Sequence, residues 1–238
     1  MEVTNLLYRD PALYDFVQSD STSPERVHEL IRRYRPDART LIDFGCGTGR
    51  DLEVFAQHFA CVGVDLQPGM VGHARHIRLG LDVRTGDMRT VRLRMLMDVV
   101  TCIGNSLAHV RDDKGIGQVF DTFAAHAGPG ALLVLCSPIA PVTRAGPTTA
   151  TVDTPGGPAT VTVRHSWDPR TRINTTHRHW VLPSGDETRG EIPRRVLFPQ
   201  ELERCAEASG FEVLDMSDGT GAGLTGPTAY TVARRAQR

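Results

Sequence analysis

Glycines at alternate positions follow a short apolar run near residue 40. Residues 41–49 read Leu-Ile-Asp-Phe-Gly-Cys-Gly-Thr-Gly and lead into a stretch with helical periodicity. Glycine has no Cβ, so such a loop can turn sharply after a strand and let its backbone approach a ligand. A second apolar run ends in Asp65, 16 residues after Gly49, where a carboxylate can accept hydrogen bonds from both hydroxyls of a ribose. The loop and the acid together predict a site for a cofactor that contains a nucleoside.

The glycine spacing separates two classes of cofactor. A dinucleotide site has the pattern Gly-x-Gly-x-x-Gly, with the pyrophosphate against a helix N-terminus. Here the pattern is Gly-x-Gly-x-Gly, and Asp43 stands two residues before it. A carboxylate at that place repels a pyrophosphate but can help to hold the ammonium of a methionyl group. The sequence therefore favours S-adenosylmethionine (SAM) over NAD.

Short apolar runs and helical stretches alternate between residues 40 and 137. The predicted strands cover 40–44, 61–65, 81–85, 97–103 and 131–137, and the predicted helices cover 50–58, 68–78 and 112–126. Such alternation is typical of βαβ units, and strands without polar alternation are covered by helices on both faces. With two further strands predicted at 211–216 and 228–233, we expect a Rossmann-like, doubly wound α/β fold with a mostly parallel seven-stranded sheet.

Two other parts of the chain have a different character. Helices are predicted at 11–19 and at 23–34, the second with Ser23 as its cap and Pro24 in its first turn. Residues 139–198 are rich in proline and predict an antiparallel β insertion after the fifth strand, followed by a helix at 199–208. Its β-type pieces are 148–152, 160–166, 173–182 and 194–198. We expect a single domain, 1–238, with a helical lid (1–37), a cofactor-binding core (38–138 and 199–238) and an insertion over the substrate cavity (139–198).

Composition excludes several classes of protein. The 27 basic and 28 acidic side chains give a formal charge of −1, without the basic face expected of a nucleic-acid carrier. No apolar run approaches the ~20 residues that span a bilayer, and the start is unlike a signal peptide, so we expect a cytoplasmic protein without a membrane. The five cysteines show no CxxC spacing, and His177 and His179, near His165 and Asp168, lack further ligand spacing. We therefore expect no metal.

The motifs resemble those of class I SAM-dependent methyltransferases over most of residues 38–137. The likeness rests on residues 43–49, on Asp65 and on the Gly-Asp-Met of residues 86–88. It implies that Asp65 binds the ribose, that Asp87 binds the adenine amino group, and that Leu66 and Met88 flank the adenine ring. The full set of cofactor-binding residues that we expect is Tyr14, Asp43, Gly45, Cys46, Gly47, Gly49, Asp65, Leu66, Asp87, Met88, Ile103 and His109.

A closer likeness follows the fourth predicted strand. Residues 102–110, Cys-Ile-Gly-Asn-Ser-Leu-Ala-His-Val, resemble a segment of glycine N-methyltransferases that lines the cofactor and substrate cavity. The likeness implies that Ile103 and His109 contact the cofactor and that Asn105 faces the substrate. Those enzymes hold the amino-acid carboxylate with an arginine where this chain has Pro138, so we do not expect glycine as the substrate.

The N-terminal region and the insertion resemble a second group. Tyr8, Tyr14, the strand-rich insertion and the Val-Leu-Phe-Pro of residues 196–199 are similar to aminosugar N,N-dimethyltransferases of the desosamine type. This likeness favours a small amine or a natural product as the methyl acceptor. The residues that we expect to contact the acceptor are Tyr8, Asn105, His165 and His179.

The residues predicted to take part in catalysis are His109, Tyr14 and Asn105. A neutral amine attacks an activated methyl group directly, whereas a phenol or enol needs a base such as His109 or Tyr14. His109 could equally form a hydrogen-bonded cavity wall, and Tyr14 could simply pack its helix.

We expect SAM-dependent N-methylation of a small molecule in specialised metabolism, with a homodimer as one option. The alternatives are O- or C-methylation of an aromatic or enolic acceptor, an NAD-dependent oxidoreductase, and a non-catalytic SAM-binding module.

Overall fold

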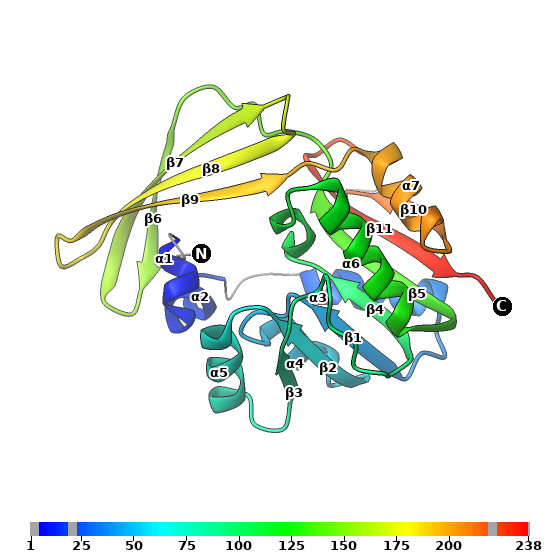
Figure 1. The fold of residues 1–238 in the computed structure, drawn as a ribbon. Helices are drawn as coiled ribbons and strands as arrows, with labels where there is room; N and C mark the ends of the chain where they lie inside the picture. The colour runs from blue at the N-terminus through cyan, green and yellow to red at the C-terminus, as the bar shows by residue number, and fades with distance from the viewer. Residues whose placement is uncertain (1–4, 19–22, 219–222, 238) are drawn as a thin grey trace.

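The protein contains two β-sheets that share no strand (Figure 1). The computed structural model describes residues 5–18, 23–218 and 223–237. The larger sheet has seven strands in the order β10-β11-β5-β4-β1-β2-β3, and the smaller has four in the order β6-β7-β8-β9.

The larger sheet has the predicted, mostly parallel arrangement. Its parallel strands are β1 (Thr40–Phe44), β2 (Ala60–Asp65), β3 (Asp82–Thr85), β4 (Met97–Cys102) and β5 (Ala127–Pro138). β11 (Thr228–Arg235) runs antiparallel to β5 and to β10 (Phe211–Ser217). The strand order reverses at β1, which lies between β2 and β4. In open α/β sheets, ligands bind outside the carboxyl ends of the strands at such a switch point.

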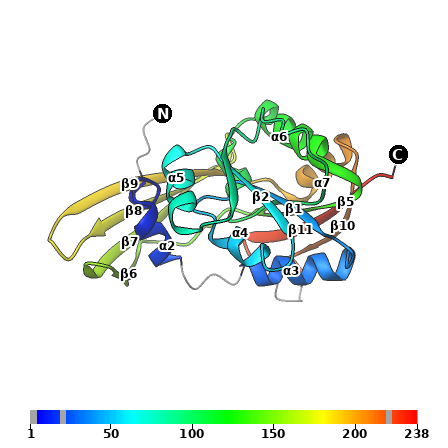
Figure 2. The ribbon, with the colours of Figure 1, turned by 90° about the horizontal axis from the view of Figure 1, so that it is seen from below.

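Helices cover both faces of this sheet (Figure 2). α6 (Asp113–His126) and α7 (Pro199–Ala208) bury Phe120 and Leu202 against Ile42 on one face. α3 (Ser23–Tyr34), α4 (Arg50–Phe55) and α5 (Pro68–Ile77) pack against Leu41 on the other. Because Leu41 and Ile42 are both fully buried, β1 shows no polar alternation in the sequence. None of the helices in the described parts of the chain has the length and apolarity to cross a membrane.

The smaller sheet is the predicted antiparallel insertion. It consists of β6 (Thr148–Thr154), β7 (Gly157–Asp168), β8 (Ile173–Val181) and β9 (Glu187–Arg195). The expectation of a strand at 194–198 is wrong, since β9 ends at Arg195 and contains Pro193. β9 is an edge strand, where proline is tolerated because one side of the backbone has no ladder partner.

Two short N-terminal helices lie on one face of the smaller sheet (Figure 1). α1 (Leu6–Arg9) and α2 (Pro11–Val17) pack Leu7 and Leu13 against Val161 and Trp180. Strand side chains alternate, so this inner face also carries every second residue of β7, β8 and β9.

A buried ion network joins the smaller sheet to the helices of the core. Arg195, at the end of β9, is 3% exposed and donates to the Arg111 carbonyl at 3.0 Å. Its Nη2 lies 2.6 Å from Glu201 on α7 and also pairs with Asp113 on α6. Because the guanidinium is planar and rigid, these contacts fix the position of the end of β9 relative to α6 and α7.

Gly63 provides a test of how closely the turn after β1 packs on β2. A Cβ at Gly63 would lie 2.7 Å from both Cys46 Sγ and Leu52 Cδ2. We expect Gly63→Ala to lower the free energy of unfolding by about 1–3 kcal/mol through overpacking. Gly72→Ala is the control, because nothing lies within 4 Å of that position on α5, and it should be neutral or stabilising. Urea denaturation measures both, and equal stability of the two variants would contradict this packing.

Candidate active site

The loop after β1 presents its backbone toward open space. Gly45, Gly47 and Gly49 have φ angles of +81°, +56° and +78°, which L side chains rarely adopt. A Cβ at Gly45 would lie 2.4 Å from Ser106 Cβ, whereas nothing lies within 4 Å of one at Gly47. On one side the loop is therefore held close to the segment that contains Ser106. On the other side it stays accessible, as binding of a ligand requires.

Asp65 sits beside this loop at the end of β2. Its Oδ2 accepts from the Gly47 amide and its Oδ1 from the Gln67 amide, both at 2.8 Å. Burial raises the pKa of the carboxyl, and the two backbone hydrogen bonds oppose that rise. Each carboxylate oxygen has a further acceptor site, so both can bind ribose hydroxyls. Leu66, the next residue, is 59% exposed and offers an apolar surface next to the ribose position.

Asp43 lies beneath the loop and is almost fully buried. Its Oδ1 accepts from the Thr101 hydroxyl at 2.7 Å. Burial raises its pKa to about 7, and Asp51 and Asp65 add to that rise. A nearby cation would favour the ionised carboxylate. Carboxylates at Asp43 and Asp65 fit the cationic methionyl part of SAM and do not suit a pyrophosphate.

The two residues predicted to contact the adenine differ in whether their side chains are free to bind it. Met88 is half-buried, with its Cε 3.5 Å from the position of a Cβ on Gly45, so it lies beside the loop. The Asp87 carboxylate pairs with Arg89 at 2.5 Å, and these hydrogen bonds lower its pKa. An adenine amino group would have to share Asp87 with this arginine.

Two of the expected cofactor residues bury their side chains in the core. Cys46 and Ile103 belong to the apolar cluster around Leu52 and Val99. Only their backbones are placed to face a ligand.

Aromatic side chains from α1, α2 and the 3-10 helix η1 (Ser106–His109) meet above the loop. The Tyr8 hydroxyl lies 3.2 Å from His109 Nε2, and the Tyr8 ring is 6.2 Å from the Tyr14 ring. His109 is exposed to solvent as a residue, yet desolvation of its ring lowers its pKa to about 4, with Arg194 and Arg111 contributing. Burial, followed by the effect of Tyr8, raises the pKa of Tyr14 to about 12. Both groups are therefore uncharged at neutral pH.

Asn105 precedes η1 in a left-handed conformation, with φ of 65°. Its amide N–H donates to the Cys136 carbonyl at 3.2 Å. Its side-chain Oδ1 is buried and has no hydrogen-bond partner among the described residues. A buried acceptor without a partner costs about 1–3 kcal/mol, which an N–H donor on a bound acceptor would recover. This observation supports the predicted role of Asn105 toward the substrate.

The structure separates the two histidines that were expected to contact the substrate. His165 lies on the inner face of the smaller sheet, opposite Thr176, with Arg178 and Arg194 near enough to lower its pKa after the effect of burial. His179 lies on the outer face, where it contacts Glu187 at 2.9 Å, and it is not part of this site.

Sequence reasoning missed Arg178 and Arg194. Their alternation with the buried Trp180 and Ile192 was the available signal for an inner-face position.

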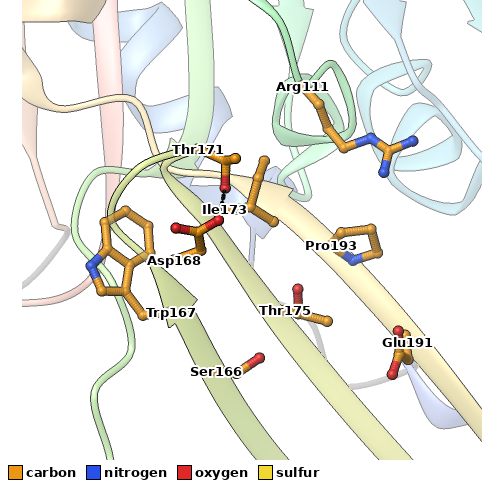
Figure 3. A pocket seen from close by; sticks show the side chains of 9 residues that line it. All are labelled: Arg111, Ser166, Trp167, Asp168, Thr171, Ile173, Thr175, Glu191 and Pro193. Carbon is orange, nitrogen blue, oxygen red and sulfur yellow. Dashed lines mark hydrogen bonds between the residues drawn. The ribbon is translucent and has the colours of Figure 1, made fainter.

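A separate hollow of about 670 Å³ lies along β7, β8 and β9 (Figure 3). Ser166, Thr175 and Glu191 line it, together with Asp168, which accepts from Thr171. It contains none of the predicted site residues. Among the described residues, no group of three or more histidine, cysteine or acidic side chains is arranged to hold a metal ion.

Asp43 predicts a specific dependence of stability on pH. The folded state binds its proton more tightly than the unfolded state, so rising pH favours unfolding between about pH 4 and about pH 7. A pKa raised from 3.8 to about 7 corresponds to about 4 kcal/mol of stability lost over that range. Asp43→Asn should remove this loss. His109, whose pKa is lowered, acts in the opposite direction but is common to both proteins.

The measurement is the difference in free energy of unfolding between wild type and Asp43→Asn across this pH range, without ligand. A difference that does not vary with pH would contradict the raised pKa.

Asp65→Ala tests the ribose contact. Loss of charged hydrogen bonds should weaken SAM binding by about 1.5–3 kcal/mol, or about 10- to 150-fold in Kd. Calorimetric titration with SAM measures this, with Asp121→Ala on the exposed surface of α6 as the control. An unchanged Kd would show that Asp65 has been misplaced.

Comparison with known proteins agrees with this geometry. A family model described as a methyltransferase domain matches residues 19–216. A dTDP-3-amino-3,6-dideoxy-alpha-D-glucopyranose N,N-dimethyltransferase from Streptomyces fradiae is 32% identical over 210 residues, which cover 82% of this chain and 79% of the relative. A dTDP-3-amino-3,4,6-trideoxy-alpha-D-glucopyranose N,N-dimethyltransferase from Streptomyces venezuelae is 32% identical over 110 residues, so the match spans about half of that relative.

A solved structure shows the same fold over nearly the whole chain. It is the SAM-bound amino pentose methyltransferase from Micromonospora echinaspora involved in calicheamicin biosynthesis, with a TM-score of 0.83, 26% identity and 99% coverage of both chains. The predicted class I fold and SAM cofactor are thereby confirmed. The chain belongs to the methyltransferase-domain family and is a SAM-dependent methyltransferase.

Proposed function

We propose that this enzyme methylates the amine of an amino sugar carried on a nucleoside diphosphate. The amino-sugar methyltransferases described above supply the substrate class. The observation that carries the proposal for this chain is a pair of arginines, Arg178 and Arg194, on the inner face of the smaller sheet. Neither has a carboxylate within ion-pair distance in residues 5–18, 23–218 or 223–237.

These arginines lie near the aromatic cluster of Tyr8, Tyr14 and His109. Arg178 is half-buried and close enough to Tyr8 and Tyr14 for its charge to interact with them. Burial lowers its pKa, and the charge of Arg194, which lies on the same face opposite Asn174, lowers it further. The Arg194 Nε is buried without a hydrogen-bond partner among the described residues. Two guanidiniums in this state suit the oxygens of a diphosphate, which they can bind in a bidentate manner.

The acceptor amine must be neutral to react, because only the unprotonated nitrogen has a free lone pair. We assign Asn105 Oδ1, which is buried without a partner among the described residues, to accept one of the amine N–H bonds and so orient the nitrogen. The contact of Tyr8 with His109 holds the opposite wall in place.

When bound, SAM supplies a methyl group on a positively charged sulfur, so the transfer forms an N–C bond as the S–C bond breaks. The positive charge moves to the acceptor nitrogen, which then releases a proton to water. A second transfer can follow because the product is again a neutral amine.

The pKa values of the two candidate bases favour nitrogen over oxygen or carbon as the acceptor atom. A phenol or enol must lose a proton during the reaction, whereas a neutral amine need not. His109, with its pKa lowered to about 4, is a weak base. Tyr14, with its pKa raised to about 12, stays protonated at neutral pH. Neither is well matched to remove a proton at neutral pH.

The test is an acceptor comparison with SAM in excess. The acceptors are a dTDP-linked amino sugar, the same amino sugar without the nucleotide, and a dTDP-linked sugar without an amine. Mass spectrometry counts the methyl groups added, and release of S-adenosylhomocysteine gives the rate. We expect methylation of the first acceptor only. Methylation of the third acceptor, or equal rates with the first two, would overturn the proposal.

Substitution of the arginines tests the diphosphate contact. Arg178→Gln or Arg194→Gln should raise KM for the nucleotide-linked acceptor about 10- to 100-fold, as the loss of a charge-assisted hydrogen bond implies, with an unchanged Kd for SAM. Arg189→Gln is the matched control, because Arg189 lies on the outer face of the same strand and should leave KM unchanged. Equal effects of the three variants would count against an inner-face anion site.

A further inference from the structure

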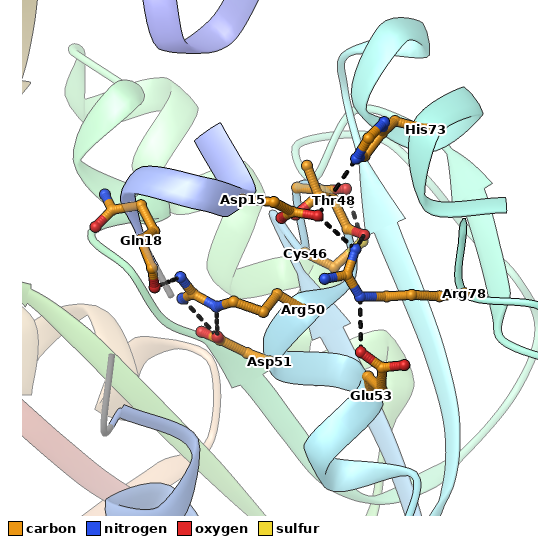
Figure 4. Close-up of polar contacts among 10 residues, drawn as sticks. Asp15, Gln18, Cys46, Thr48, Arg50, Asp51, Glu53, His73 and Arg78 are labelled. Atoms are coloured by element: carbon orange, nitrogen blue, oxygen red, sulfur yellow. Dashed lines mark hydrogen bonds and ion pairs between the residues drawn. The ribbon is translucent and has the colours of Figure 1, made fainter. Parts of the chain in front are cut away.

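Asp15, on α2, joins three parts of the cofactor half of the protein (Figure 4). Its carboxylate accepts from the Thr48 hydroxyl in the glycine loop. It also accepts from Arg78 Nη1, just after α5, at 2.7 Å and lies 3.3 Å from His73 Nε2 on α5. The side chain is only 15% exposed, so these contacts are shielded from water.

Arg78 and Arg50 extend the connection. Arg78 Nη1 also donates to the Thr48 carbonyl at 3.0 Å, and its Nε donates to Glu53 on α4 at 2.9 Å. Arg50, which follows the loop directly, pairs with Asp51 at 2.7 Å and donates to the Gln18 carbonyl at the end of α2. The glycine loop and α2 are therefore tied together at both ends of α2's last turn.

The residue before Asp15 is Tyr14, on the acceptor side of the same helix. Consecutive residues on a helix point about 100° apart, so fixing Asp15 on the loop fixes the direction of Tyr14. On its other side, α2 packs Leu13 against Trp180 of the smaller sheet. The position of α2 therefore depends on its contacts with the glycine loop as well as on its packing against the smaller sheet.

We propose that Asp15 is a positioning residue that couples the conformation of the cofactor loop to the placement of Tyr14. The coupling rests on the proposed function only in taking the cluster of Tyr8, Tyr14 and His109 as the acceptor side. Loss of the Asp15 contacts loosens α2 and the loop together. By linkage, SAM binding to the loop then favours the seated position of α2, and a seated α2 favours SAM binding.

Trp180 reports on the seating of α2 without any acceptor. It is 3% exposed and packed against the N-terminal helices, and the chain has two tryptophans in all. In a Trp167→Phe background, its fluorescence therefore follows the contact between α2 and the smaller sheet. Because this signal and SAM affinity need no methyl acceptor, they test Asp15 even if the amino-sugar proposal fails.

The experiment compares Asp15→Asn, Thr48→Val and the double variant in that background. We expect Asp15→Asn to weaken SAM binding about 5- to 50-fold, the range of typical coupling between sites. Its Trp180 emission should shift to longer wavelength without SAM and return toward that of the parent at saturating SAM. The loss of SAM affinity in the double variant should be smaller than the sum of the two single losses, since Asp15→Asn weakens and Thr48→Val removes the hydrogen bond that joins these residues. Thr48→Ser, which keeps the hydroxyl, should retain the coupling.

Asp121→Asn serves as the charge-matched control on the exposed surface of α6 and should leave both signals unchanged. Additive losses of SAM affinity in the double variant, or a red-shifted Trp180 that SAM does not reverse, would overturn the coupling. An Asp15→Asn protein with unchanged affinity and emission would overturn it as well. Should Asp15→Asn fail to fold by circular dichroism, Thr48→Val alone, with Thr48→Ser beside it, decides the question by the same two signals.

Discussion

The turn from β1 into α4 packs so closely on η1 that Gly45, at the contact, has no room for a side chain. The geometry of the site follows from this close packing. A Cβ on Gly45 would overlap Ser106, whose hydroxyl instead donates to the Gly45 carbonyl at 3.1 Å. The same contact brings Asn105, which precedes η1, and His109, its last residue, to the edge of the glycine loop. One packing constraint thus sets the distance between the cofactor cradle and the acceptor wall. Methyl transfer needs that distance fixed, because an in-line displacement gains most of its rate from the alignment of its two reactants.

Charge is divided across this site. Asp43 and Asp65 lie on the core side, where burial raises the pKa of both and a cationic ligand would favour their ionised forms. Arg178 and Arg194 lie on the side of the smaller sheet. In the proposed reaction, methyl transfer moves positive charge from the SAM sulfur, on the acidic side, to the acceptor nitrogen, which then loses a proton to water.

The parts of this structure that sequence predicts are those set by neighbours in the chain. The parallel core follows from local apolar runs, and Asp65 follows from its spacing to the glycine loop. The expected position of His179 is wrong: this residue is next to Trp180 on β8, so the two lie on opposite faces, and Trp180 is on the inner face because the N-terminal helices pack there, which no local pattern encodes. Pro193 led to the wrong bounds for β9, because proline is tolerated in an edge strand but the sequence does not show which strand lies at the edge of the sheet. Asp15 and Thr48 are 33 residues apart and belong to elements whose packing no local pattern encodes.

Only a few elements connect the two sheets. This matters for how substitutions could change the acceptor specificity of such an enzyme. The Arg195 network fixes one end of the insertion to α6 and α7, and α1 and α2 support its inner face. Between those points, the inner residues of β7, β8 and β9 are free of the constraints that shape the glycine loop. We therefore expect substitutions at positions such as His165 or Arg178 to alter the proposed acceptor site while the cofactor cradle stays intact. Because α2 contacts both the insertion and the loop, it is the element through which a change in one would reach the other.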